Sequence, residues 1–383
     1  MAMLQLTELP PLSLYIHTPW CIRKCPYCDF NSHTSKQIPE AAYLKALLND
    51  FDSELPYIQG RPLRSIFIGG GTPSLLSPTF YRSLLEYINA KIDWAEDIEI
   101  TMEANPGTVE QKSFAGYREA GINRLSLGVQ SFDDKKLEAL GRIHGGTEAQ
   151  TAINIARQSG FDNFNLDLMH GLPGQSEQQA LLDLETALSF KPPHLSWYQL
   201  TIEPNTEFYS RPPTLPEDDD LWQIQEAGQA LLKRHHLIQY EVSAYATKGH
   251  QAKHNLNYWR FGDYLGIGAG AHGKVTTLDP SGSTIMRYQK TRQPEAYLNR
   301  IDNYKASNQI LAAEDLPLEF LMNVMRLNEG VSESLYTEST GLSLQSLEPA
   351  LSQARLDKLI EPSRLKATEK GHLFLNQLLD RFL

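Results

Sequence analysis

The sequence predicts an α/β fold built around a parallel β-sheet. Six segments with the composition of buried strands alternate with segments in which apolar residues recur at helical spacing. Such alternation is typical of parallel strands joined by right-handed crossovers through helices. In folds of this kind the loops that follow the strands build the functional site, and each conspicuous motif of this chain follows a predicted strand. The periodicity leaves open whether the sheet stays open or curls into a barrel.

The expected elements of this region follow one another in a regular order. The strands are expected at 12–17, 64–68, 98–103, 124–130, 165–169 and 194–202. The helices are expected at 41–57, 78–92, 109–120, 134–140, 148–158 and 176–190. Apolar residues at helical spacing, among them Tyr43, Leu47 and Phe51, support the first helix. Capping-box patterns at 147–150 and 176–179 support the starts of the last two helices.

The pattern changes after the sixth strand. A helix is expected from Leu221 to about residue 235, because the acidic residues at 217–220 suit its positively polarised start. The stretch 240–274 is rich in aromatic residues and glycine and is expected to be irregular. From about residue 311 the sequence predicts two helices, a short hairpin at 360–368 and a helix at 369–382, an order typical of a winged-helix-like module. We therefore expect a core domain at 1–215, an extension at 216–305 and a small C-terminal winged-helix-like helical domain at 306–383.

Composition restricts the class of protein. The chain has 383 residues, of which 41% are hydrophobic and 21% charged, enough for one large domain and a small one. Mean hydropathy is -0.38, no apolar run approaches the length of a membrane span, and residues 1–11 lack the pattern of a signal peptide. The net charge of -11 disfavours nonspecific nucleic-acid binding, and the C-terminal module has no basic recognition face. We therefore expect a cytoplasmic protein that does not bind nucleic acid.

All three cysteines of the chain, Cys21, Cys25 and Cys28, lie within eight residues. Their C-x3-C-x2-C spacing suits a loop folded over one metal centre. A [4Fe–4S] cluster normally takes four thiolates, so three leave one iron able to bind a small molecule. A zinc site completed by His17 or His33 is an alternative, although the usual two-pair spacing is absent. A disulfide or a chance grouping of inert thiols explains the spacing less well.

This motif after a first strand resembles that of the radical S-adenosylmethionine (SAM) superfamily, and the resemblance extends over residues 12–380. It implies an incomplete (β/α)6 barrel, with SAM bound at the open iron through its amino and carboxylate groups. In that superfamily an electron from the cluster splits SAM to a 5′-deoxyadenosyl radical. Reduced thiols and an oxygen-sensitive cluster fit the expected cytoplasmic location.

Further motifs extend the resemblance residue by residue. The run Gly-Gly-Gly-Thr-Pro at 69–73 resembles the motif that receives the SAM amino group. Arg142 is expected to pair with the SAM carboxylate, because arginine binds carboxylates through two hydrogen bonds, and Asp167 is expected to take a ribose hydroxyl. The expected SAM contacts are Tyr15, Tyr27, Gly70, Gly71, Thr72, Glu103, Gln130, Arg142 and Asp167. Taken singly, each fits a capped turn, a surface ion pair or a satisfied buried acid, but their succession at strand ends favours ligand contact.

Two features separate possible functions within the superfamily. The glycine motif is typical of the branch around oxygen-independent coproporphyrinogen oxidases, but those enzymes have a further cysteine where this chain has Phe30, and an extra N-terminal region that is missing here. The run at 254–259, His-Asn-Leu-Asn-Tyr-Trp, resembles the HNxxYW motif of radical-SAM-like heme chaperones. Imidazole ligates heme iron and aromatic rings pack on porphyrins, so His254 is the expected heme contact. His250 and His272 are alternative ligands, and another interpretation is that the motif only orders a loop.

The first hypothesis is therefore a heme chaperone that binds a [4Fe–4S] cluster, SAM and heme. By resemblance, it passes heme to respiratory-chain enzymes or other hemoproteins, and its cluster governs homodimerisation and at most peripheral contact with the membrane. The cluster then regulates, with no catalytic residue assigned and no net turnover. The second hypothesis is an oxygen-independent coproporphyrinogen III oxidase, which decarboxylates two propionates by radical chemistry. A radical SAM enzyme that modifies RNA is a third, disfavoured by the acidic composition.

Overall fold

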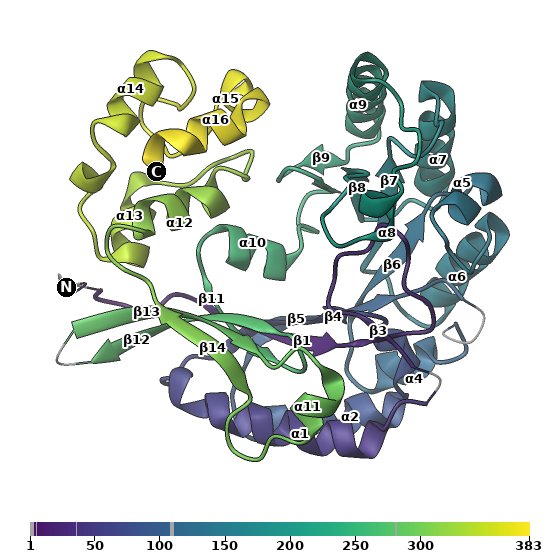
Figure 1. Cartoon of the computed structure of the whole chain (residues 1–383), viewed down its shortest axis with the longest axis horizontal. Helices are drawn as coiled ribbons and strands as arrows, with labels where there is room; N and C mark the ends of the chain where they lie inside the picture. The colour runs from purple at the N-terminus through teal and green to yellow at the C-terminus, as the bar shows by residue number, and fades with distance from the viewer. Residues whose placement is uncertain (1–3, 5, 36, 108–110, 280–281) are drawn as a thin grey trace.

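The computed structural model of the chain describes residues 4, 6–35, 37–107, 111–279 and 282–383 (Figure 1). Within that part of the chain a sheet of twelve strands runs in the order β14-β13-β12-β11-β1-β4-β5-β6-β7-β8-β10-β9. Because β14 and β9 are the two ends of this order, the sheet curves without closing. The α/β class and the incomplete barrel are confirmed.

The centre of the sheet consists of the six predicted strands, which run parallel to one another. They are β1 (Leu12–Thr18), β4 (Leu63–Gly70), β5 (Trp94–Ala104), β6 (Arg124–Gln130), β7 (Phe164–His170) and β8 (His194–Gln199). The connecting helices are α1 (Glu40–Glu54), α2 (Pro78–Asn89), α4 (Phe114–Glu119), α5 (Asp134–Ala139), α6 (Gly146–Gln158) and α7 (Glu177–Ser189), followed by α9 (Asp218–Arg234). Residues 109 and 110 of the third predicted helix lie outside the described residues.

The stretch 240–274 is ordered, so the prediction of irregular structure was wrong. It contains β10 (Ala244–Ala246), α10 (Lys253–Trp259), β11 (Asp263–Ile267) and the start of β12 (His272–Asp279). Strand β11 pairs in parallel with β1, Leu265 opposite Leu14, and extends the sheet beyond its first strand. These elements are three to eight residues long, too short for a clear period, and their pairing partners lie far away in the sequence.

The sheet continues at both ends in antiparallel strands. Beyond β12 lie β13 (Gly282–Lys290) and β14 (Lys305–Ile310), with α11 (Pro294–Leu298) between them. At the other end, β10 pairs with β8 and with β9 (Ile238–Gln239). A separate parallel pair, β2 (Trp20–Cys21) and β3 (His33–Thr34), brackets the cysteine loop.

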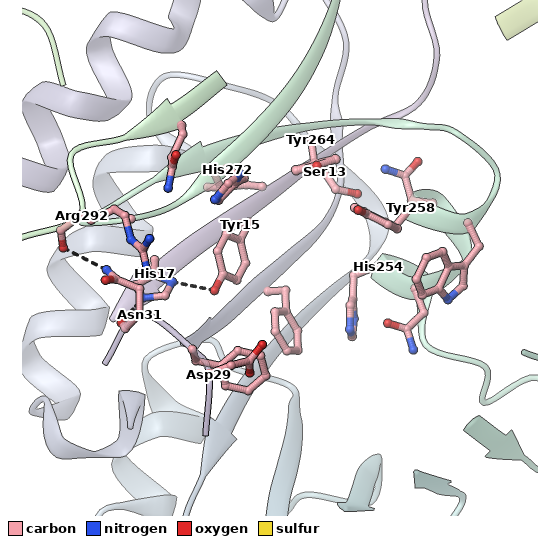
Figure 2. A pocket seen from close by; sticks show the side chains of 18 residues that line it. Ser13, Tyr15, His17, Asp29, Asn31, His254, Tyr258, Tyr264, His272 and Arg292 are labelled. Atoms are coloured by element: carbon pink, nitrogen blue, oxygen red, sulfur yellow. Dashed lines mark hydrogen bonds between the residues drawn. The ribbon is translucent and has the colours of Figure 1, made fainter. Parts of the chain in front are cut away.

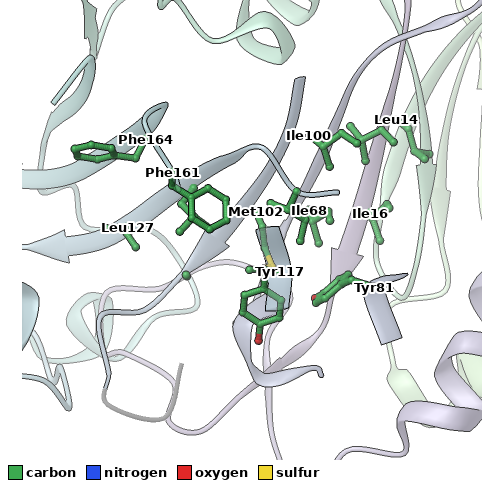
Figure 3. Packing of buried hydrophobic residues seen from close by; sticks show 14 of the residues in the cluster. Leu14, Ile16, Ile68, Tyr81, Ile100, Met102, Tyr117, Leu127, Phe161 and Phe164 are labelled. Atoms are coloured by element: carbon green, nitrogen blue, oxygen red, sulfur yellow. The ribbon is translucent and has the colours of Figure 1, made fainter. Parts of the chain in front are cut away.

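The main core lies between the sheet and the helices on its outer face. Strand residues such as Leu14, Ile68 and Met102 pack there with Tyr81 and Tyr117 from the helices (Figure 3). The alternate residues of the same strands are polar and face the interior of the curved sheet, for example Glu103 of β5 and Asp167 of β7. Because successive side chains of a strand point to opposite faces, one set of strands builds both the apolar core and a polar interior.

The C-terminal helices enclose a second apolar core. They are α12 (Leu316–Val324), α13 (Glu333–Thr340), α14 (Ala350–Leu356), α15 (Glu369–Leu373) and α16 (Leu375–Leu379). Phe261, in the turn before β11, and Ile285 of β13 belong to the same core, so these helices pack against that turn and β13. Of the expected hairpin at 360–368 the structure has one isolated bridge, Ile360 with Ala367, while Leu365 bridges to Val331 outside that segment; the expected last helix is divided. Segment boundaries at 215/216 and 305/306 stay a prediction.

No helix in the described ranges is long and apolar enough to cross a bilayer.

Candidate functional site

The three cysteines lie on a loop held at both ends by the sheet. The loop follows β1, its two flanks pair as β2 and β3, and Cys28 N donates to Cys25 O at 3.1 Å. All three thiols are free and line one cavity of about 380 Å³. Burial raises the pKa of Cys21 and of Cys28. The cysteines thus face a common, partly enclosed space.

A single-ion site is not preformed here. Within the described residues, no group of three or more His, Cys, Asp or Glu is arranged to hold a metal ion. His17 and His33, the candidate fourth zinc ligands, do not line the cysteine cavity. Since Zn–S bonds are about 2.3 Å, a zinc site needs its sulfurs in near contact, whereas a four-iron cluster holds them farther apart. Three thiols line one cavity whose described lining contains no fourth cysteine and no histidine, so the ligand count matches a cluster with one open iron better than a four-ligand zinc site.

The glycine motif packs against the start of the cysteine loop. Gly71 N donates to Thr18 O and Thr72 N to Trp20 O, both at 2.7 Å. A Cβ atom on Gly71 would lie 2.5 Å from Trp20 O, so this position requires glycine. Thr72 Oγ1 donates to Cys21 Sγ at 3.4 Å. The close approach that the glycine permits is to the loop backbone, and this contact fixes the cysteine loop to β4.

Two buried carboxyl groups face the cysteine cavity. Glu103 Oε2 accepts from Gly70 N at 3.1 Å, and burial together with the nearby Asp167 raises the pKa of Glu103 to about 8. Asp167 accepts from Ser126 Oγ and Asn165 Nδ2, each at 2.8 Å, and burial raises its pKa as well. A cationic ligand in this cavity would offset the effect of burial and stabilise the ionised form of both carboxyl groups. SAM carries two such cationic groups, an ammonium and a sulfonium.

Arg142 also lines the cysteine cavity. Its Nη2 donates to Asn105 Oδ1 at 2.8 Å and to Gly128 O at 2.7 Å, and its Nη1 lies 3.8 Å from Cys25 Sγ. Its Nε is buried and, within the described structure, has no hydrogen-bond partner. A buried guanidinium with an unused donor beside the cysteines fits the carboxylate of a ligand.

The structure brings most of the expected SAM contacts together. Tyr27, Gly70, Gly71, Thr72, Glu103, Gln130, Arg142 and Asp167 all line the cysteine cavity. Gln130 Oε1 accepts from Tyr198 OH at 2.9 Å. Tyr15 and His254 do not line this cavity and belong to a second one. Their roles as ligand contacts, like those of the other residues, stay predictions.

The second cavity, of about 620 Å³, has aromatic walls (Figure 2) and shares lining residues with the first. Its aromatic residues are Tyr15, Phe30, Phe67, Tyr258, Trp259 and Tyr264. Tyr15 OH is bonded to His17 Nδ1 at 2.8 Å, and His17 Nε2 donates to Asn31 O at 2.9 Å, so both ring nitrogens of His17 are used. Phe30, Asn255 and Trp259 line both cavities.

His254 lies in the wall of the aromatic cavity with one nitrogen engaged. Its ring stacks on Phe67 with centroids 4.1 Å apart, and its Nδ1 donates to Glu99 Oε1 at 3.2 Å. Burial lowers the pKa of His254, so the ring is neutral near pH 7. Its Nε2 has no hydrogen-bond partner within the described residues and retains its lone pair. His272 also lines this cavity, whereas His250 lines neither.

The other residues of the motif hold α10 in place. Asn255 Nδ2 donates to Tyr240 OH at 3.1 Å and Asn257 Nδ2 to Asp263 O at 2.8 Å. The two asparagines of the motif therefore have the ordering role that the alternative interpretation expected.

Sequence reasoning missed Glu99, Asn105, Phe67 and Arg292 as residues of these cavities or their support. The sequence did contain a signal for Glu99. Glu99, Thr101 and Glu103 alternate with apolar residues along β5, which is typical of a strand with one polar face.

Comparison with known proteins identifies the class of protein. The radical SAM superfamily model matches residues 15–187, and the HemN C-terminal domain model matches residues 311–374. The fold and the cysteine loop thus define a radical SAM protein, as the sequence predicted. The chain is 53% identical over 381 residues to "Heme chaperone HemW" of Escherichia coli, covering 99% of this chain and 100% of the relative. It is 34% identical over 383 residues to the Bacillus subtilis protein of that name, covering 97% and 99%. The chain belongs to the HemW heme chaperone family.

A solved structure supports the fold alone. The coproporphyrinogen III oxidase HemN from Escherichia coli, described as a radical SAM enzyme, superimposes with a TM-score of 0.81 at 22% identity. The match covers 98% of this chain and 90% of that one.

Proposed function

We propose that this protein is a heme chaperone. It binds a [4Fe–4S] cluster through Cys21, Cys25 and Cys28, SAM beside the cluster, and heme in the aromatic cavity. It works in the cytoplasm as a homodimer whose formation the cluster controls. It passes heme to hemoproteins, among them respiratory-chain enzymes at the membrane surface. Support comes from the names of its full-length relatives and from the cavity next to the cysteine loop.

The observation that carries the proposal is the aromatic cavity beside the cysteine cavity. Its volume of about 620 Å³ is in the range of cofactor pockets, and its rings suit the faces of a porphyrin. The neutral His254 offers Nε2 to iron while Glu99 holds Nδ1, an arrangement common around metal-bound histidines. Loading this cavity with heme also buries the Phe30 ring, which is 61% exposed.

The cysteine cavity is proposed to serve the cluster and SAM. Glu103 and Asp167 would hold the cationic part of SAM and Arg142 its carboxylate. The bound cluster supplies one-electron chemistry to SAM in this superfamily. For a chaperone we propose that its role is to order the cysteine loop, which contributes Phe30 to the heme cavity.

The test is a titration of the anaerobically reconstituted protein with hemin, followed through the Soret band. The wild type is compared with His254→Ala and with His250→Ala, a control because His250 lines neither cavity. We expect saturable one-to-one binding by the wild type and the control, and weaker binding with a changed Soret band for His254→Ala. Equal binding by all three would move heme away from His254. Absence of saturable binding by the wild type would overturn the proposal, and turnover of coproporphyrinogen III would then favour the oxidase.

A further inference from the structure

The aromatic cavity has one positively charged end. Arg292, in the loop between β13 and α11, lines it, and in Figure 2 Arg292 lies at the end of the cavity opposite Tyr258 and His254. The side chain is exposed, and within the described residues no ion pair or hydrogen bond engages its guanidinium. An unpaired arginine at the rim of an aromatic cavity is available to a planar carboxylate of a ligand.

The position of Arg292 is fixed through its backbone. Asn31 Nδ2 donates to Arg292 O at 2.9 Å and to Ala269 O at 3.0 Å. Gly270 N donates to the neighbouring Thr291 O at 2.9 Å, and a Cβ atom on Gly270 would lie 2.2 Å from Asn31 Nδ2. Asn31 lies three residues after Cys28, so the arginine is attached to the loop that carries the cysteines.

The remaining ionisable groups of the cavity do not duplicate this charge. Burial lowers the pKa of His17 to about 4 and, together with Arg292 and Arg287, lowers that of His272, so both imidazoles are neutral near pH 7. Among the described residues that line the cavity, Arg292 alone has a side chain that is cationic at all ordinary pH values. The cavity also contains the carboxylate of Asp29, which forms no ion pair with Arg292.

We propose that Arg292 binds the propionate carboxylates of the porphyrin and so determines the orientation of the macrocycle. The propionate edge then lies at the exposed β13–α11 rim, and the apolar edge lies toward Tyr258 and Trp259. This inference rests on the proposed function and adds a selectivity: the cavity distinguishes porphyrins with free carboxylates from their esters.

The test crosses two ligands with four forms of the full-length reconstituted protein. Hemin and hemin dimethyl ester are titrated into the wild type, Arg292→Gln, Arg292→Lys and Arg234→Gln. Arg234 is an exposed arginine of α9 that lines neither cavity. We expect Arg292→Gln to bind hemin about tenfold more weakly than the wild type, which is the loss typical of one charged hydrogen bond. Its affinity for the ester should stay within about twofold of the wild-type value. Arg292→Lys recovers part of the hemin affinity, and Arg234→Gln matches the wild type.

The binding data distinguish a failure of the Arg292 assignment from a failure of the proposed function. If the wild type binds hemin saturably but Arg292→Gln prefers hemin over its ester as strongly as the wild type does, the role of Arg292 is overturned and the proposed function stands. If the wild type binds neither ligand saturably, the proposed function fails and the assignment of Arg292 fails with it. Because Arg292 is exposed, its substitution is not expected to affect folding, and circular dichroism checks this.

Discussion

Nδ1 of His254 lies 3.2 Å from Oε1 of Glu99, an interaction that joins α10 to β5 across 155 residues of sequence. Burial alone would raise the pKa of Glu99, but the bond from His254 and the proximity of Arg124 outweigh it and lower that pKa to about 2. Glu99 is therefore ionised at all working pH values, and it selects the His254 tautomer that carries its proton on Nδ1.

Glu99→Gln is expected to weaken hemin binding about tenfold, because a carboxylate behind a metal-bound imidazole orients the ring and increases its basicity. A neutral partner also makes the iron less electron-rich, so we expect the reduction potential of the bound heme to rise. The measurements are the hemin titration and a spectroelectrochemical titration. Glu96→Gln, an exposed position on the same strand, is the control. An unchanged potential in Glu99→Gln would show that Glu99 does not support an iron ligand.

The pKa of Glu103 makes the stability of the apoprotein depend on pH. Because its native pKa of about 8 exceeds the ordinary value of 4.5, the native state retains a proton that the unfolded state releases between these values. The contribution of Glu103 to stability therefore falls as pH rises through this window. The free energy of unfolding of Glu103→Gln, taken relative to that of the wild type, is expected to rise by at least about 1 kcal/mol from pH 5 to pH 9. One pKa unit corresponds to about 1.4 kcal/mol. Urea unfolding at both pH values measures this, with exposed Glu226→Gln as the control. Parallel pH profiles for Glu103→Gln and the wild type would contradict it.

Phe30 is expected to contribute to ligand binding and not to folding. Its ring is 61% exposed and lines both cavities, so a ligand would bury it. Phe30→Ala should weaken hemin binding at least about tenfold, because burying such a ring contributes roughly 1.5–3 kcal/mol. Its free energy of unfolding should stay within about 0.5 kcal/mol of the wild type. Ile301→Ala, which removes an apolar side chain that is 80% exposed and lines neither cavity, should change neither quantity. A strongly destabilised Phe30→Ala would mean that the ring packs in the native loop.

A buried ion network attaches the sheet extension to α1. Lys290 of β13 donates to Asp50 and, at 2.6 Å, to Glu54, and all three side chains are fully buried. Lys290→Ala would leave two buried carboxyl groups without their shared partner, which typically costs about 3–5 kcal/mol. Chemical denaturation should show this loss, whereas Lys233→Ala on the exposed side of α9 should stay near the wild type. A loss below about 1 kcal/mol would indicate that Lys305, 3.1 Å from Glu54, compensates.

Much of the core could be read from local pattern. The six parallel strands and the cluster motif follow from short-range periodicity and spacing, and the structure has both. The extension could not be read in this way. Strand β11 has five residues and owes its parallel pairing to β1, about 250 residues earlier, so no local window contains the information.

The sequence by itself determined the class of the protein, the cysteine loop and the set of polar residues at the strand ends, because motif spacing and strand alternation are local properties. Tertiary structure decided how these residues divide between two cavities. Tyr15 and Tyr27 were expected to share one site, yet they line different cavities, because Tyr15 lies on β1 and Tyr27 on the loop beyond it. Likewise, Glu99 reaches His254, and Arg292 is held by Asn31, only because the curved sheet brings distant segments together. Such contacts depend on packing between elements, which a residue's sequence neighbours do not specify.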